Sequence, residues 1–211
     1  MYLLSKDIVF PPVHLANQDG LLAIGGDLSL ERLLLAYKSG IFPWYNQGEP
    51  IIWYSPNPRM VLFPYQLKIS KSMKKLIRKG EFDITFNQNF SEVIAQCKSI
   101  PRNDQGGTWI TDEMQQAYIN LHKNGYARSV EVWKDDELVG GLYGIDLGTV
   151  FCGESMFSKV SNTSKLAFIY LIDKLKKENY RIIDCQVYNK HLASLGAKEI
   201  TREAFLTFLK Q

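Results

Sequence analysis

A predicted hairpin near the middle of the chain most constrains the fold. Two strand-like stretches, residues 138–145 and 149–156, are joined by an Asp-Leu-Gly connection that is short enough for a hairpin. A further strand at 129–133 precedes them, so the sequence predicts an antiparallel meander. Apolar residues then recur at helical spacing over 166–175, after polar residues suited to an N-cap. We therefore expect a helix packed against this sheet.

Three polar side chains stand out within apolar strands. Glu154 lies in the second strand of the hairpin, where a carboxylate requires a partner or a chemical role. A short strand at 181–187 carries Asp184 and Gln186, which alternation places on one face, roughly 7 Å apart by the rise per residue. Ile183 falls on the opposite face. The three polar groups form either a buried, mutually satisfied cluster or part of a reaction site.

The N-terminal third of the chain is rich in proline and glycine, which interrupt long regular elements. Ser29 is suited to cap a short helix over 28–39, and Gly40 is suited to end it. Large, mostly aromatic side chains follow between residues 41 and 54, among them Trp44. They either pack two lobes together or form a platform on which a nucleic-acid base stacks.

Basic residues cluster in the window 67–80, which has the length of a helix. Helical spacing places four of them on one face, opposite apolar side chains such as Met73 and Leu76. Repulsion within that face destabilises a helix unless an anion meets it, and nucleic-acid phosphate is the obvious anion. A solvated surface helix is the alternative. The four residues are Lys71, Lys74, Lys75 and Arg78.

The composition is that of an ordinary globular protein of 211 residues, with 45% hydrophobic residues and a net charge of +3. Its three cysteines are widely spaced, which favours neither a zinc cluster nor a disulfide framework, so we expect no bound metal. No apolar run approaches the ~20 residues of a membrane helix, and residues 1–13 lack the features of a signal peptide. The sequence therefore predicts a cytoplasmic protein that contacts no membrane.

Short motifs spread over nearly the whole chain resemble the leucyl/phenylalanyl-tRNA-protein transferase family. They run in the order GLLAIGGDLS, GIFPWY, WYSPNPR, GTWIT, GGLYG, FCGESMFS, SNTSK, DCQV and HLASLGA. One departure is that the chain stops soon after Phe208, where many members continue. The resemblance implies an α+β fold. A small N-terminal α/β domain, residues 1–63, would precede an N-acetyltransferase-like domain, residues 64–211, with a mixed sheet flanked by helices.

The resemblance also implies the reaction. Leu or Phe, and less readily Met, would pass from aminoacyl-tRNA to the α-amine of proteins that begin with Arg or Lys, creating an N-degron. The ester is already activated, so no cofactor is expected. The family's catalytic pair falls on Asp184 and Gln186: the amide oxygen would hold the attacking amine, and the carboxylate would orient it and help to remove its proton. We expect Asp184→Asn and Gln186→Ala to fold normally and to lose transfer.

Substrate contacts follow from the same resemblance. Two tryptophans would meet the terminal adenosine, three apolar side chains would hold the donor side chain, and Glu154 would face the cationic acceptor. The basic face of the predicted helix at 67–80 would contact the tRNA backbone. The residues assigned to the substrates are Trp44, Trp109, Tyr118, Leu142, Glu154, Met156 and Ile183.

Three other functions stay open. A CoA-dependent N-acetyltransferase of the same fold normally has a glycine-rich pyrophosphate loop before its crossover helix, and residues 157–165 contain no glycine. A Fem-type transferase, which also uses aminoacyl-tRNA, fits the chemistry but not the GIFPWY and GTWIT motifs. A non-catalytic tRNA-binding module would explain the basic helix, yet it would leave the three polar strand residues without a role.

Overall fold

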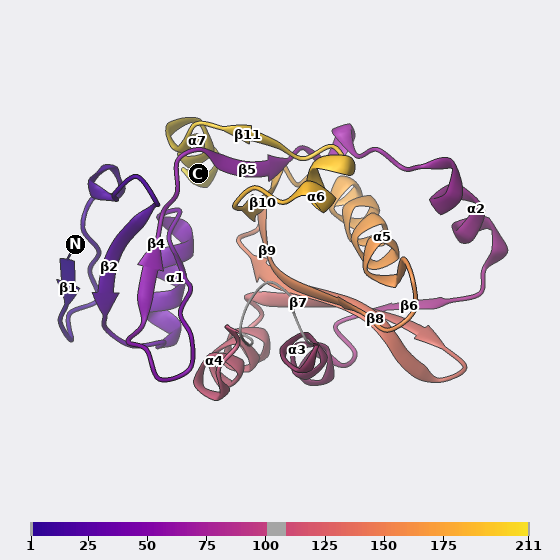
Figure 1. Ribbon diagram of the computed structural model, residues 1–211, viewed down its shortest axis with the longest axis horizontal. Coiled ribbons are helices and arrows are strands. Elements are labelled where there is room, and N and C mark those ends of the chain that lie inside the picture. Colours follow the sequence, from indigo (N-terminus) through magenta and orange to yellow (C-terminus); the bar gives the residue numbers. More distant parts are fainter. Residues whose placement is uncertain (1, 101–108, 211) are drawn as a thin grey trace.

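The computed structural model describes residues 2–100 and 109–210, which form two sheets and the helices that cover them (Figure 1). The smaller sheet has the strand order β1-β2-β4-β3. Its strands are β1 (Tyr2–Leu4), β2 (Leu21–Gly25), β3 (Phe42–Pro43) and β4 (Ile52–Tyr54). Helix α1 (Leu30–Lys38) lies between this sheet and the rest of the molecule (Figure 1). The N-terminal residues therefore form a small α/β unit of their own.

The larger sheet has seven strands in the order β11-β5-β10-β9-β8-β7-β6. The predicted meander is confirmed, because β6 through β9 pair antiparallel with their neighbours in sequence. Strand β10 pairs parallel with β9 on one side and antiparallel with β5 on the other, which makes the sheet mixed. The strands are β5 (Arg59–Leu62), β6 (Asp83–Phe86), β7 (Ala127–Lys134), β8 (Glu137–Asp146), β9 (Val150–Ser158), β10 (Ile182–Gln186) and β11 (Lys198–Ile200).

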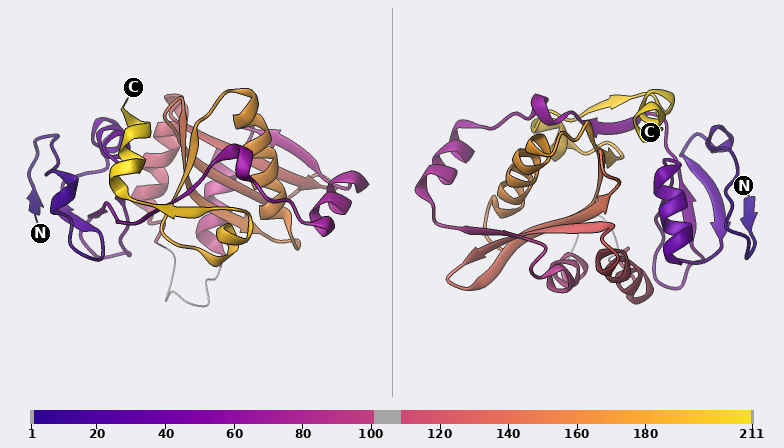
Figure 2. Two further views of the ribbon diagram at one scale, coloured as in Figure 1. Left: turned by 90° about the horizontal axis from the view of Figure 1, so that it is seen from above. Right: turned by 180° about the vertical axis from the view of Figure 1, so that it is seen from behind.

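Helices cover both faces of the larger sheet. Figure 1 and the rear view in Figure 2 show α3 (Phe90–Ser99) and α4 (Asp112–Lys123) on one face and α5 (Thr163–Lys177) on the other. Helix α5 connects β9 to β10, as a parallel pair requires. Helix α2 (Lys71–Lys79) lies at the end of the molecule farthest from the small sheet (Figure 1). The remaining helical segments are η1 (Val13–Leu15), η2 (Pro64–Gln66), α6 (Lys190–Ser194) and α7 (Arg202–Leu209).

Local signals in the sequence set most helix ends. Ser29 accepts a hydrogen bond from the backbone N–H of Arg32, and Thr111 accepts one from the N–H of Met114. Each side chain thereby satisfies a backbone donor that the first helical turn leaves free. Gly80 ends α2 in the left-handed conformation, with φ of 64°. The predicted helices at 28–39 and 67–80 are confirmed.

Close packing on both faces of β8 explains the adjacent Gly140 and Gly141 of this strand. A Cβ atom placed on Gly140 would lie 2.4 Å from the hydroxyl oxygen of Thr163, and one on Gly141 would lie 2.7 Å from the carbonyl oxygen of Val130. Thr163 is buried and donates its hydroxyl hydrogen to the carbonyl of Val139. Gly140 therefore lets the first turn of α5 pack directly on the sheet, whereas Gly141 leaves room for the backbone of β7 and the ring of Phe157.

The α+β class is confirmed, with a small N-terminal unit followed by a larger mixed sheet flanked by helices. The division at residue 63 stays a prediction; β5, which precedes that position, pairs with β10 and β11 of the larger sheet. Across the described ranges 2–100 and 109–210, no helix has both the length and the apolar character needed to cross a membrane.

Candidate active site

A cavity opens where β9 and β10 separate. The two strands pair in parallel from Ile182 opposite Val150 to Asp184 opposite Cys152. Beyond that point β9 continues alongside β8, whereas β10 turns away at a β-bulge between residues 184 and 186. The cavity between them has a volume of about 710 Å³. The position of the cavity is therefore set by the backbone pairing of β9 and β10.

One side of the cavity is apolar. Leu142 from β8, Met156 from β9 and Ile183 from β10 line it, together with Trp44 and Trp109. The structure thus brings together all five residues that the resemblance assigned to the donor. Ile183 and Asp184, neighbours on β10, both line this cavity.

Asp184 is held in a buried ion pair with Arg59 of β5. The guanidinium Nε and Nη2 atoms donate to the two carboxylate oxygens at 2.8 and 2.6 Å. Both side chains are 1% exposed. Burial alone lowers the pKa of Arg59, but the charge and hydrogen bonds of Asp184 outweigh burial, so the pKa of Arg59 is raised. This bidentate geometry is among the strongest that a carboxylate makes in proteins.

Arg59 was not identified from the sequence. Its guanidinium lies between the rings of Phe42 and Phe205, 4.8 Å from each centroid, and Nη1 donates to the carbonyl of Gly40 at 3.2 Å. Packing between two rings fixes the plane of the guanidinium. The available signal was a single arginine at the start of the apolar stretch 60–63, since a cation there needs a buried anion as its partner.

Gln186 leaves the regular strand. Its φ of 65° places it in the left-handed region, and its backbone N–H donates to Asp184 Oδ1 at 2.9 Å. The prediction that period-two alternation runs through Gln186 is therefore wrong, because the bulge at residue 185 and this tight turn replace the extended backbone. The two residues are nevertheless connected, since the Asp184 carboxylate fixes the backbone of Gln186.

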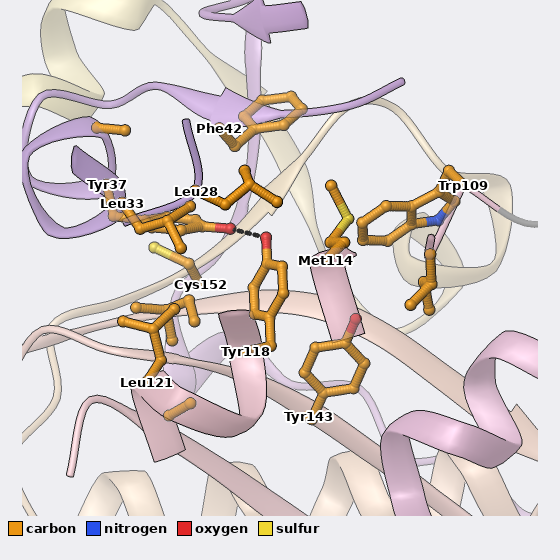
Figure 3. Packing of buried hydrophobic residues seen from close by; sticks show 14 of the residues in the cluster. Leu28, Leu33, Tyr37, Phe42, Trp109, Met114, Tyr118, Leu121, Tyr143 and Cys152 are labelled. Carbon is orange, nitrogen blue, oxygen red and sulfur yellow. Dashed lines mark hydrogen bonds between the residues drawn. The ribbon is translucent and has the colours of Figure 1, made fainter. Parts of the chain in front are cut away.

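Glu154 joins Gln186 to two buried tyrosines. Its Oε1 accepts from Gln186 Nε2 at 2.9 Å, and its Oε2 accepts from the Tyr118 hydroxyl at 3.0 Å. The Tyr118 hydroxyl also meets the hydroxyl of Tyr37, drawn as a dashed line in Figure 3. Glu154 is partly exposed and lines the cavity, whereas both tyrosines are buried behind it. Tyr118, assigned to substrate binding, thus reaches the cavity through Glu154.

The pKa of Glu154 is raised to about 7. Burial is the main cause, and the nearby negative charge of Asp184 adds to it. The hydroxyls of Tyr37 and Tyr118 and the charge of Arg59 act in the opposite direction, because they stabilise the carboxylate. Burial also raises the pKa of both tyrosines well above the ordinary value, and Glu154 adds to that rise. The tyrosines therefore stay protonated and act as hydrogen-bond donors.

The N-terminal aromatic segment divides into two groups. Ile41, Phe42, Tyr45 and Trp53 are buried, which confirms for them the hypothesis that these side chains pack the lobes together. Trp44 differs, because it is 38% exposed and lines the cavity. A packed shell of aromatic side chains therefore supports one accessible ring.

His191 lies in α6, whose N-cap is Asn189, and it is partly buried in the cavity wall. Burial lowers the pKa of its imidazole, and the charge of Lys165 adds to this effect. The imidazole is therefore neutral at physiological pH.

The basic face lies apart from the cavity. Helix α2 carries it at the far end of the molecule (Figure 1), and among the described residues that line the cavity none comes from α2. Met73 is buried beneath the helix, which fits the expected apolar side. All four cations of this face, Lys71, Lys74, Lys75 and Arg78, are exposed.

Comparison with known proteins identifies the family. A family model described as leucyl/phenylalanyl-tRNA protein transferase matches residues 61–210, and a model of the N-terminal domain of the same transferase matches residues 26–57. The chain belongs to the leucyl/phenylalanyl-tRNA protein transferase family. The predicted enzyme class, a transferase, is thereby confirmed.

Curated relatives in this family are similar along nearly the whole of this chain. A leucyl/phenylalanyl-tRNA–protein transferase from Flavobacterium johnsoniae is 65% identical over 210 residues, covering 100% of this chain and 99% of the relative. The protein of the same name from Flavobacterium psychrophilum is 58% identical and covers 100% of both chains. In the corresponding protein from Syntrophus aciditrophicus, 57% identical, the match covers 99% of this chain and 87% of the relative.

Two solved structures align with most of this chain, but with TM-scores below 0.5. A functionally unknown conserved protein from Staphylococcus epidermidis aligns with a TM-score of 0.48 and 12% identity, covering 86% of this chain and 68% of that one. A GCN5-related N-acetyltransferase from Kribbella flavida aligns with a TM-score of 0.41 and 10% identity, over 85% of this chain and 63% of that one. TM-scores this low give no information about activity.

Proposed function

We propose that this enzyme transfers Leu or Phe, and less readily Met, from aminoacyl-tRNA to the α-amine of proteins that begin with Arg or Lys. The product would carry an N-degron, and the reaction would take place in the cytoplasm. One observation carries the proposal: a single cavity has an apolar wall and a polar wall that includes Glu154 and Asp184, and Gln186 is hydrogen-bonded to both carboxylates. An apolar donor side chain and a cationic acceptor require such a pair of walls.

The apolar wall suits the donor. Leu142, Met156 and Ile183 offer no buried polar group to which a polar donor side chain could bind, and the thioether of Met156 adapts to branched or aromatic shapes. One methylene changes the preference of such a pocket by only ~1 to 3 kcal/mol, so several hydrophobic donors should react. Trp44 and Trp109 line the same cavity and are suited to stack on the terminal adenosine.

The polar wall suits the attacking amine. Gln186 donates its amide nitrogen to Glu154, so its amide oxygen is the end that is left to accept a hydrogen bond from the amine. Asp184 holds the backbone of Gln186 and is itself held by Arg59. We therefore assign Gln186 a catalytic role in placing the amine, and we assign Asp184 a positioning role within the pair.

The basic face suits the tRNA backbone. Its four cations are exposed on one short helix, where Arg78 also donates to the carbonyl of Lys74, and exposed cations of this kind can meet phosphate groups. Contacts with phosphate position a nucleic acid without reading its sequence. The same face should therefore serve tRNAs for different amino acids.

A transfer assay with matched acceptors tests this function. Purified protein is given tRNA charged with labelled leucine, together with a protein beginning with Arg or the same protein beginning with Met. We expect label in the first acceptor and little in the second. Acetyl-CoA and uncharged tRNA serve as controls for the CoA-dependent and non-catalytic alternatives. Acetylation of the acceptor, or tRNA binding without any transfer, would contradict the proposal.

A further inference from the structure

The two carboxylates of the polar wall differ in their freedom to react. Both oxygens of Asp184 accept hydrogen bonds from Arg59, and Oδ1 also accepts from the backbone N–H of Gln186. Arg59 in turn is fixed between Phe42 and Phe205. Protonation of Asp184 would leave a buried guanidinium without its counter-charge, which proteins tolerate poorly. Asp184 is therefore a poor acceptor for a proton from the substrate.

Glu154 is the accessible carboxylate. It is partly exposed, it lines the cavity, and Gln186 donates to it at 2.9 Å. Gln186 donates to Oε1 and Tyr118 donates to Oε2, and the Tyr37 hydroxyl also stabilises the carboxylate. A carboxylate oxygen has two lone pairs, so Oε1 retains a site for a proton beside the bond from Gln186. An amine held by the oxygen of the Gln186 amide would thus lie next to Glu154.

We infer that Glu154 accepts the proton that the acceptor's α-ammonium group must lose before it attacks the ester. The inference rests on the proposed function and extends it, because it assigns the proton to neither member of the Asp184–Gln186 pair. Tyr118, and Tyr37 behind it, act as positioning residues that hold the carboxylate and stabilise its charged form.

The proton and bond changes balance without a further reactant. An N–H bond of the ammonium group breaks and its proton passes to a Glu154 oxygen, which leaves a neutral amine. The nitrogen lone pair then forms a C–N bond with the ester carbonyl carbon, and the bond from that carbon to the ribose oxygen breaks. A second proton leaves the nitrogen for the ribose oxygen. Glu154 finally returns its proton to water.

The electrostatics of the site favour this transfer. An α-amino group ordinarily has a pKa of about 7.7–8.0, so proton transfer to a carboxylate of ordinary pKa is unfavourable by on the order of 10³-fold. Glu154 has a pKa of about 7, which reduces this factor to about tenfold. Among the described residues, the charged and titratable groups that interact with it are Asp184, Arg59, Tyr37, Tyr118 and Cys152. Burial and Asp184 raise the pKa of Glu154, and Arg59, Tyr37 and Tyr118 limit the rise.

The pH dependence of Glu154→Gln tests the inference. Single-turnover transfer of labelled leucine to a peptide beginning with Arg is measured from pH 6.5 to 8.5, within seconds because the ester is labile to base. At pH 6.5 we expect the variant to be about 100-fold slower than the wild type. The ratio of the wild-type rate to the variant rate should fall at least tenfold by pH 8.5, because the acceptor's α-amino group is then largely deprotonated without help from Glu154. A constant gap at every pH would overturn the inference and leave Glu154 a recognition residue.

A second variant keeps the test decisive if Glu154→Gln folds poorly. Tyr118→Phe removes a hydrogen bond that stabilises the Glu154 carboxylate, so the pKa of Glu154 should rise. The acid limb of the wild-type pH profile should then move to higher pH, whereas Tyr126→Phe, at a partly exposed tyrosine, should leave it in place. An unmoved limb in Tyr118→Phe would overturn the inference. If the wild type transfers no leucine at any pH, the proposed function falls as well.

Discussion

Replacement of Asp184 by Asn should weaken the fold as well as the reaction. The sequence alone predicts a variant that folds normally, but the carboxylate forms a bidentate pair with Arg59, and both side chains are 1% exposed. Removing one partner of such a pair leaves an uncompensated charge in the interior. We therefore expect Asp184→Asn to lower the free energy of unfolding by about 3 to 5 kcal/mol. A protein of ordinary stability, about 5 to 15 kcal/mol, would remain mostly folded at 25 °C.

A double-mutant cycle measures this coupling. Arg59→Met alone should cost a similar amount, because it leaves Asp184 without its partner, whereas the double variant buries no isolated charge. The double variant should therefore be more stable than the sum of the single losses predicts, by about 2 to 3 kcal/mol. Urea unfolding followed by tryptophan fluorescence and circular dichroism gives the three values, provided that the m-values agree.

An exposed ion pair provides the control for this cycle. Lys79 and Glu81 lie 3.0 Å apart with side chains 51% and 45% exposed, so solvent screens their attraction. Glu81→Gln should change the free energy of unfolding by less than about 1 kcal/mol. An Asp184→Asn protein that unfolds at the wild-type urea concentration, or single losses that simply add, would refute the account of the Arg59–Asp184 pair.

Three further predictions concern Glu154, the basic helix and the donor pocket. Folded Glu154 has a pKa of about 7 against an ordinary 4.5, so its contribution to stability is present below pH 4.5 and is lost as pH rises through 7. In urea titrations, the free energy of unfolding of Glu154→Gln should therefore increase relative to that of the wild type by roughly 3 kcal/mol between pH 4 and pH 8. A difference that does not change with pH would contradict this prediction. Alanine substitutions in the basic face should weaken tRNA binding for all isoacceptors and reduce the slope of log K against log salt by about one unit per lost contact, whereas an unchanged slope would indicate a solvated surface helix. In transfer assays tRNA charged with valine or isoleucine should react poorly, because branching at Cβ does not fit the apolar wall, and efficient transfer of valine would count against the pocket assignment. The face to be substituted comprises Lys71, Lys74, Lys75 and Arg78.

Much of the fold follows from signals that act over a few residues. The hairpin around Gly148, the helix that Thr111 caps and the basic helix ending at Gly80 all depend on periodicity, caps and glycine. These signals are local, so a sequence shows them directly. The candidate donor side chains were found by their resemblance to a family, since nothing local marks an apolar residue as the wall of a cavity.

The contacts that define the polar wall could not be predicted from local sequence signals. Arg59 and Asp184 are 125 positions apart, and Tyr37 and Tyr118 are 81 positions apart. Their contacts depend on β5 entering the sheet beside β10 and on α1 packing near α4, which are long-range events. The bulge before Gln186 also escaped prediction, because its sequence alternates like that of an ordinary strand. Strand alternation fails here at a residue that the proposed chemistry uses, which is where such failures are expected.

Single-turnover transfer by Gln186→Ala tests the central claim most directly. Gln186 is partly exposed, and its removal leaves Glu154 with the hydrogen bond from Tyr118, so this variant should fold and bind Leu-tRNA as the wild type does. Gln96→Ala on α3, which removes a hydrogen bond to Glu92, is the matched control and should transfer normally. With saturating donor and a peptide beginning with Arg, the account predicts that Gln186→Ala is slower by about 100-fold. A folded, donor-binding Gln186→Ala protein with undiminished transfer would contradict it.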